Sequence, residues 1–549
     1  MSRHRRQKAG SRPAPPTIEL RFDELGAIVE RAQAALSAED HAKLKAAIDT
    51  LAFVTAELKT RQTSLDHLRR LLFGATTEKT RTIVGEDAPT SPSAPSASAE
   101  PGSPRPGHGR TAAAAYTGAE TIKIPHPALR RGASCPKCPS GKIYPLAEPA
   151  TLVRITGMAP LGATVYECER WRCNLCGEVF TAPAPDGVGD AKYDATASSM
   201  IGLLKYGCGL PFHRIEVLQR GLRIPLPAAT QWELVRDARE PLVPVWDELL
   251  HQAAQGEVLY NDDTTMRVLA LTAEQRRAAA ADEETDARTG VFTSGIVATR
   301  DGHHIALFFT GRQHAGENLR DVLAQRAAER APPIQMCDAL ARNTPGDFDT
   351  LLASCIAHAR RRFVDVVDHF PAEVRHVLEI LREVYRTDAL ARERALSPDE
   401  RLHLHQTESG LRMAELKTWL HQQLDDHLVE PNSGLGTAVT YMLNHWAKLT
   451  LFLRVPGAPL DNNVCERALK KAILHRKNAL FYRSLEGARV GDVFMSLIHT
   501  AELNAIAPFD YLVALQRHPQ AVALDPSEWL PWTYEATLIE LQARASPSR

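Results

Sequence analysis

The chain has 549 residues, and its 65 lysines and arginines nearly balance 66 aspartates and glutamates, for a formal net charge of -1. This length predicts several packed domains, and the balanced charge excludes a uniformly basic nucleic-acid coat. No run approaches the about 20 uncharged apolar residues of a membrane span, and no apolar export segment follows the basic start, so a cytoplasmic protein without membrane contact is expected.

The N-terminal part is predicted to be a basic tail followed by a helix. Residues 1–17 combine basic side chains with Pro, Ser and Gly and indicate a disordered tail, either solvated or bound to DNA. Within residues 18–81, leucines recur every seven residues from Leu44 to Leu72, which is typical of a coiled coil. A homo-oligomer is therefore expected, although an amphipathic helix packed on its own domain would show the same repeat.

Residues 82–118 are rich in Pro, Ser, Ala and Gly, which predicts a flexible linker, and residues 119–190 hold two Cys-x-x-Cys pairs. Four thiolates arranged in two such pairs bind one tetrahedral ion, so a zinc ribbon with structural Zn²⁺ is predicted. Two buried pairs or a redox pair are the alternatives, and Cys168 is a spare ligand. The predicted zinc ligands are Cys135, Cys138, Cys173 and Cys176.

Residues 191–250 are predicted to be helical. Pro211, Gly221 and Trp232 mark two or three short helices joined by turns. A helix-turn-helix that binds DNA is one interpretation, but most such short helical pairs are packing units in a larger domain. The sequence leaves both interpretations open.

Residues 251–345 carry the pattern of an α/β core with acids at strand ends. Glu257–Tyr260 is a short apolar strand that delivers Asp262 at its C-terminal end. Residues 333–337 form a further short strand, which ends at Asp338.

Between these two strands the sequence predicts a hairpin and a helix. Residues 291–299 and 305–310 are rich in β-forming residues and flank a turn at residues 300–303. Residues 315–330 then have a helical pattern. The predicted order is β-β-β-α-β, with an acid after the first and the fourth strand.

The C-terminal half is predicted to contain a helical insertion and the rest of the core. Residues 346–455 are compatible with helix almost throughout, residues 456–515 are assigned to the second part of the core, and residues 516–549 to a tail. Asp461 or Asn462 can cap a helix that starts near the beginning of the second part.

On that helix Glu466, Leu469 and Ile473 fall at helical spacing, so the carboxylate is expected to share the stripe that packs on the sheet. The surrounding segment, residues 461–490, has seven basic side chains against three acidic ones. We interpret this excess as a contact surface for DNA phosphates, the alternative being a solvated helix face. The predicted DNA-binding residues are Arg467, Lys470, Lys471, Arg476, Lys477 and Arg483.

Three acids beside a basic helix suit one kind of chemistry. Two hard cations held by carboxylates activate a water or a 3′-hydroxyl and stabilise charge on the leaving oxygen of a phosphodiester. Oxygen ligands favour Mg²⁺ or Mn²⁺ over zinc. Any single acid in the chain is more often a helix cap or an ion-pair partner, but two acids at strand ends and one on a helix beside a phosphate-binding surface would suit two such metal ions.

At this point the sequence resembles the transposases of the insertion sequence 66 group, over most of the chain. The resemblance rests on short stretches spread along the sequence: Leu68–Gly74, Gly107–Arg110 with the two Cys-x-x-Cys pairs, Cys355–Phe363, Pro459–Arg467, His475–Phe481, Ser496–Asn504 and Pro508–Leu512.

The resemblance implies an RNase H-like catalytic core with a mostly α-helical insertion, and an Asp-Asp-Glu triad of Asp262, Asp338 and Glu466. It implies a DNA transposase, associated with the nucleoid, that binds terminal repeats and target DNA, cleaves, and transfers the 3′-hydroxyl, with companion proteins from the same element. Alternation along the strand favours Asp262 over Asp263 as the first acid.

Other interpretations remain open. His358 and Arg360–Arg362 either support the scissile phosphate or form a helix face paired with Asp365 and Asp368. The whole protein is alternatively a catalytically silent zinc-ribbon DNA-binding protein, or a metal-dependent nuclease without a joining step.

Overall fold

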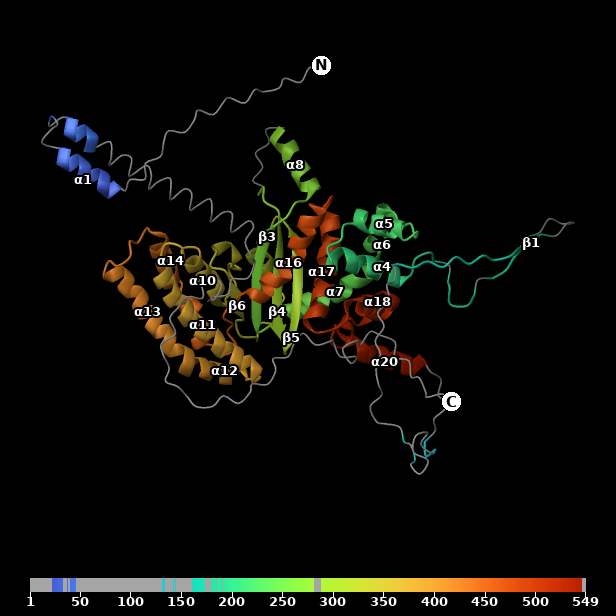
Figure 1. Ribbon diagram of the computed structural model, residues 1–549. Coiled ribbons are helices and arrows are strands. Elements are labelled where there is room, and N and C mark those ends of the chain that lie inside the picture. Colours follow the sequence, from blue (N-terminus) through green and yellow to red (C-terminus); the bar gives the residue numbers. More distant parts are fainter. Residues whose placement is uncertain are drawn as a thin grey trace, which may run out of the picture. The chain divides into compact units, whose positions relative to one another are not determined.

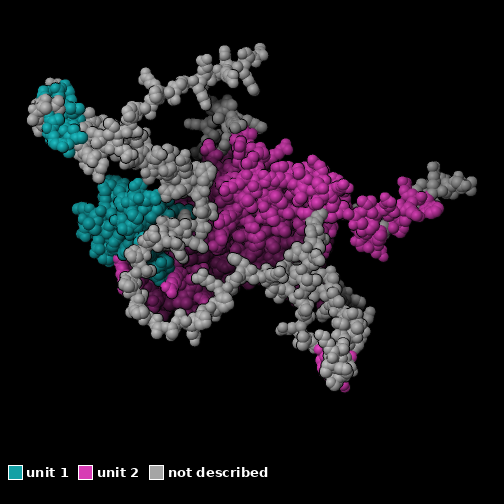
Figure 2. All heavy atoms as spheres, in the orientation of Figure 1, with its two compact units in different colours: residues 1–87, 360–383, 418–439 teal, residues 88–359, 384–417, 440–549 magenta. Residues whose placement is uncertain are grey.

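The computed structural model (Figure 1) describes only part of the chain. The described residues are 22–32, 37, 40–45, 131–133, 142, 144, 160–172, 179–183, 185–189, 191–280 and 288–545. The basic tail 1–17, the linker 82–118, the leucines from Leu51 to Leu72 and the four cysteines of the predicted zinc ribbon lie outside them. Figure 2 distinguishes two compact units: residues 1–87, 360–383 and 418–439, and residues 88–359, 384–417 and 440–549.

Within the described residues, most elements are helices. The α-helices are α1 (Phe22–Ala32), α4 (Ala195–Gly202), α5 (Phe212–Gly221), α6 (Ala228–Ala238), α7 (Val243–Ala254), α8 (Leu269–Ala280), α9 (Ala315–Leu323), α10 (Ile356–Val364), α11 (Pro371–Glu393), α12 (Pro398–Leu404), α13 (Gly410–Asp425), α14 (Gly434–Asn444), α15 (Trp446–Leu449), α16 (Asn463–Ala479), α17 (Leu485–Leu503), α18 (Pro508–Arg517), α19 (Pro519–Leu524) and α20 (Tyr534–Ala545). Short 3-10 and π segments are η3 (Leu203–Gly207), η4 (Glu240–Leu242), η5 (Ala341–Asn343), η6 (His405–Ser409), η7 (Leu451–Leu453) and η8 (Pro526–Trp529). None of the described helices is both long and apolar enough to cross a membrane.

The centre of the larger unit is a mixed sheet of five strands in the order β5-β4-β3-β6-β7. Its strands are β3 (Val258–Thr265), β4 (Phe292–Arg300), β5 (His303–Gly311), β6 (Ile334–Cys337) and β7 (Leu351–Ser354), and a separate small sheet pairs β1 (Arg170–Arg172) with β2 (Val179–Thr181). β4 runs antiparallel to both β3 and β5, whereas β6 and β7 run parallel to β3. The sequence therefore predicted a mixed α/β architecture correctly.

The predicted hairpin is confirmed. β4 and β5 are joined by Asp301 and Gly302, whose φ angles are 48° and 82°. Two consecutive residues with positive φ form the type I′ turn that matches the twist of the two strands. The strand ending before Asp338 is also confirmed, as β6.

Three predicted boundaries were wrong. β3 does not end before the acids but continues to Thr265, because β4 pairs with it along its whole length. β7 interrupts residues 346–455, which were predicted as helical almost throughout, since a strand of four residues leaves little periodicity. Helix α9 stops at Leu323, because the buried Gln255 side chain accepts a hydrogen bond from Ala327 N and donates to Gln325 O, which holds the next residues in a turn.

Helix α17 protects the exposed edge of the sheet. β5 is an edge strand, and an edge strand presents unpaired N–H groups. Four polar residues spaced one turn apart accept hydrogen bonds from alternate amides of β5. These acceptors are Asp492, Ser496, Thr500 and Asn504, and the donors are the amides of Thr310, Phe308, Ala306 and His304.

The segment predicted as a C-terminal tail is instead folded to Ala545 as α19, η8 and α20. Trp529 is 1% exposed and packs in the core with Leu530 and Tyr534. Tyr511 donates a hydrogen bond to Trp529 O at 2.9 Å. This segment is therefore part of the core of the larger unit.

In the helical insertion, the Asp388 carboxylate joins α11 to the next two helical segments. Arg401 Nη2 lies 2.6 Å from its Oδ1, Arg392 Nη2 lies 3.2 Å from its Oδ2, and the buried His405 ring is 3.3 Å away. Burial raises the pKa of Asp388, but the hydrogen bonds of His405 and the charges of the two arginines outweigh it and lower the pKa to about 2.

We expect Asp388→Asn to lower the free energy of unfolding by about 3 kcal/mol at neutral pH, because it leaves the charge of Arg401, whose side chain is 16% exposed, with a neutral partner. Because the Asp388 pKa is lower in the folded than in the unfolded chain, its stabilisation is complete at pH values above the unfolded-state pKa. It is lost as the pH falls toward 2. Urea unfolding at several pH values tests this. The exposed Glu408→Gln in η6 is the matched control, and an equal loss from both changes would contradict the prediction.

Candidate active site

The first two predicted acids follow neighbouring parallel strands. β3 and β6 pair with Tyr260 opposite Met336. Two residues further along each strand lie Asp262, still within β3, and Asp338, directly after β6. The parallel pairing thus brings these two carboxylates to the same level of the sheet.

Asp262 and the neighbouring Asp263 point to opposite faces of β3, since side chains alternate along a strand. The Asp263 side chain is only 2% exposed, its Oδ2 lies 2.7 Å from His314 Nδ1, and its Oδ1 lies 3.5 Å from Arg342. It therefore anchors the strand to the start of α9. Asp262 lies on the face of the sheet covered by α16. Gly295, its partner on β4, accepts a hydrogen bond from the Cys465 thiol of that helix.

The charge environment of Asp262 differs from that of an ordinary surface carboxylate. Burial raises its pKa, and the charges of Asp338, Asp263 and Glu466 raise it further, to about 7, against a hydrogen bond from Asp263 N. Repulsion among carboxylates is relieved by a bound cation. The donor set, with carboxylate oxygens from Asp262, Asp338 and Glu466, fits hard divalent cations such as Mg²⁺ or Mn²⁺.

Asp338 is oriented by residues that the sequence analysis did not identify. Its Oδ1 accepts hydrogen bonds from Leu340 N at 3.1 Å and from the Asn343 side chain. Asn343 is fully buried, and its carbonyl accepts from the side chains of Asn261 at 2.8 Å and Gln335 at 2.7 Å. The amides of Asn261 and Gln335, each next to apolar residues in its strand, were the available signal, because buried amides need partners.

Glu466 lies in the first turn of α16, and its side chain is 31% exposed. The buried stripe of this helix consists of Cys465, Ala468, Leu469, Ala472 and His475. The predicted stripe of Glu466, Leu469 and Ile473 was therefore offset, and the carboxylate lies at the border of the sheet-facing surface. Gly295 on β4 allows α16 to approach the sheet closely, since a Cβ at that position would fall 3.0 Å from the Leu469 side chain.

The two residues predicted as caps, Asp461 and Asn462, hold the start of α16 through different contacts. Asn462 occupies the cap position, but its side chain donates to Asn261 O at 3.2 Å, on β3. The Asp461 carboxylate instead accepts a hydrogen bond from Asn463 N at 3.1 Å. Both contacts fix the first turn, and with it Glu466, relative to β3.

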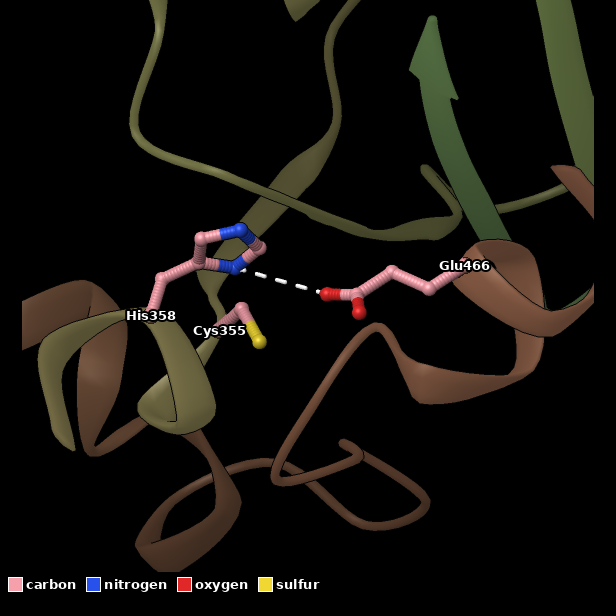
Figure 3. A group of neighbouring side chains, drawn as sticks. All are labelled: Cys355, His358 and Glu466. Carbon is pink, nitrogen blue, oxygen red and sulfur yellow. Dashed lines mark ion pairs between the residues drawn. The ribbon is translucent and has the colours of Figure 1, made fainter. Parts of the chain in front are cut away.

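A histidine and a cysteine approach Glu466 from the start of α10. His358 Nδ1 lies 3.7 Å from Glu466 Oε1, and the Cys355 side chain points into the same space (Figure 3). Burial raises the pKa of the Cys355 thiol to about 12. Arg361 and Arg362 follow in the last turn of α10.

The six predicted DNA-binding residues divide into two groups. Arg467, Lys470, Lys477 and Arg483 are exposed, and no ion pair holds them within the described part of the chain. Their positive charges are thus available to a ligand.

The other two are engaged inside the protein. Lys471 Nζ lies 2.8 Å from Glu502 and donates to Gly207 O, which joins α16 to α17 and η3. Arg476 donates to Thr264 Oγ1 at 3.0 Å and to Thr265 on β3.

Comparison with known proteins connects the larger part of the chain to one family. The sequence profile described as "Transposase IS66 family" matches residues 191–490. Two similar chains come from Sinorhizobium fredii (strain NBRC 101917 / NGR234) and are named uncharacterized proteins. The first, y4jD, is 27% identical over 518 residues, which covers 90% of this chain and 98% of the relative. The second, y4hP, is 27% identical over 438 residues, or 73% of each chain.

Proposed function

The chain belongs to the transposase IS66 family, and we propose that it binds the terminal repeats of an insertion element, cleaves the DNA there, and joins the freed 3′-hydroxyl to target DNA. The observation that carries this proposal is the convergence of Asp262, Asp338 and Glu466 from two neighbouring strands and one helix. In the five-stranded sheet, β4 is the second strand along the chain and runs antiparallel to the other four. This arrangement supports an RNase H-like assignment for the sheet.

Asp262, Asp338 and Glu466 would hold two Mg²⁺ or Mn²⁺ ions. When bound, such ions activate the attacking oxygen and stabilise the leaving one. The chain itself contributes orientation: Asn343 orients Asp338, and Asn462 holds the first turn of α16 against β3. Each step is an in-line displacement, in which a new oxygen–phosphorus bond forms as the old one breaks.

The test is Mg²⁺-dependent cleavage and joining of a DNA fragment that carries the element's own ends. Cleavage and joining together support the proposal. Binding without nicking would identify a silent DNA-binding protein, and cleavage without joining would identify a nuclease. Companion proteins from the same element belong in a second reaction mixture, since the family resemblance implies them.

We further propose that the exposed basic residues on and after α16 contact DNA phosphates. Lys470→Ala is expected to reduce the slope of log affinity against log salt by about one, as for the loss of one phosphate contact. Lys471→Ala is the matched control on the adjacent residue, and it should leave the slope unchanged because Lys471 pairs with Glu502. Equal slopes for wild type and Lys470→Ala would contradict the assignment.

The structural zinc site remains a proposal, supported by the spacing of Cys135, Cys138, Cys173 and Cys176. We expect at least one zinc per chain in protein purified without chelators, and unfolding of this segment when the metal is removed. Metal analysis by mass spectrometry checks this, and a content well below one would rule the ribbon out. Self-association through the leucine repeat is likewise proposed.

A further inference from the structure

Cys355, His358 and Glu466 form a cluster of three different metal-ligating groups beside the proposed active site. Cys355 directly precedes α10, His358 lies in the first turn of that helix, and Glu466 lies in the first turn of α16. One ligand atom from each residue lies within 4.8 Å of the others. Figure 3 shows the three side chains directed into one space from two separate elements.

One polar atom of this cluster lacks the hydrogen bond that buried groups usually have. His358 Nδ1 is buried and has no hydrogen-bond partner among the described residues. Its distance of 3.7 Å from Glu466 Oε1 is too long for a hydrogen bond. The Cys355 residue is 1% exposed, and its sulfur accepts backbone hydrogen bonds from Asn462 N, at 3.3 Å, and from His358. A ligand between these groups would give His358 Nδ1 a partner, and the Cys355 sulfur and the Glu466 carboxylate lie within reach of the same ligand.

The donor set selects the class of ligand. Mg²⁺ prefers oxygen ligands alone, whereas sulfur, imidazole nitrogen and carboxylate oxygen together suit a borderline cation such as Zn²⁺ in tetrahedral coordination. A divalent cation with one thiolate and one carboxylate is electrically neutral, which makes such a complex tolerable beside the buried Cys355.

We propose that Cys355, His358 and Glu466 bind a divalent cation of the Zn²⁺ class, and that this binding inhibits the enzyme by withdrawing Glu466 from the catalytic Mg²⁺ ions. Binding forms a metal–sulfur bond and releases the thiol proton of Cys355 to solvent. Neutral His358 supplies a nitrogen lone pair, and water completes the coordination. The inhibitory role rests on the proposed function, whereas the binding site itself does not.

The binding test uses the full-length chain with Co²⁺ as the probe. Cys355→Ser and His358→Ala are each expected to bind one equivalent of Co²⁺ less than wild type and to lose part of the sulfur-to-cobalt absorption. Cys208→Ser removes an exposed thiol elsewhere in the same unit and serves as the matched control. Circular dichroism verifies that each variant is folded. Equal stoichiometry and absorption in wild type, Cys355→Ser and His358→Ala would overturn the site.

The inhibition test adds Zn²⁺ to the Mg²⁺-supported DNA cleavage reaction, with each variant compared with its own activity without zinc. The zinc concentration for half inhibition should rise at least about tenfold in Cys355→Ser, since one of three protein ligands is lost. An unchanged value would overturn the inhibitory role. A wild-type chain that binds the extra Co²⁺ but cleaves no DNA would leave the metal site intact and count against the proposed function.

Discussion

Glu466→Gln is expected to lower Mg²⁺-dependent DNA cleavage and strand transfer by at least about 10³-fold, equivalent to about 4 kcal/mol in the activation barrier. Glutamine keeps the shape of the side chain but removes the charge that would bind a cation. DNA affinity should remain close to that of wild type, because the exposed basic residues of α16 are retained.

Rates of nicking and joining on labelled DNA ends, together with a binding assay, measure both effects. Glu486→Gln, at an exposed residue of α17 that pairs with Arg239, is the control for loss of one carboxylate in the same region. Asp262→Asn should resemble Glu466→Gln. A Glu466→Gln variant as active as wild type would make Glu466 structural and the proposed triad wrong.

Phe494→Ala is expected to lower the free energy of unfolding by about 4 kcal/mol, because it leaves a cavity in the core of the larger unit. Phe494 is fully buried on α17, and its ring stacks on Tyr206 with centroids 5.4 Å apart. It also packs tightly against Gly202, so that truncation would loosen α4 and η3 from α17.

Chemical denaturation followed by tryptophan fluorescence measures this loss. Ile539→Ala removes a large apolar side chain that is 68% exposed, and should change stability by less than about 0.5 kcal/mol. If the two variants lost equal stability, the packing role assigned to Phe494 would be wrong. Phe494→Ala should still cleave DNA below its lowered melting temperature and lose cleavage only above it. This result would show that Phe494 contributes to stability and not to catalysis.

Much of the fold could be predicted because its signals are local. The turn at Asp301 and Gly302 follows from residues that accept positive φ, and β6 follows from a short apolar run with a polar end. The helices of the insertion follow from periodicity over many residues. By contrast, β7 has four residues and depends on pairing with β6, which no local pattern reveals.

The candidate site was only partly predictable. Asp262, Asp338 and Glu466 could be selected from strand ends, helix spacing and family resemblance. Asn343, which orients Asp338, carries no such signal, because its role depends on contacts with Asn261 and Gln335.

The basic segment shows the same limit. Sequence identified its charge, but not that Lys471 pairs with Glu502, 31 residues away, or that Arg476 holds β3.

The sequence by itself determined the order of β3, β4, β5 and β6 along the chain, since these strands depend on composition, period and turn chemistry. Its resemblance to a known family indicated the class of protein and the acids worth testing. Only the tertiary structure decided that Asp263 binds His314 while the charges of Asp338 and Glu466 act on Asp262, and that Cys355 and His358 meet Glu466. Such choices depend on which distant segments pack together. The pattern within any one segment is compatible with several of them.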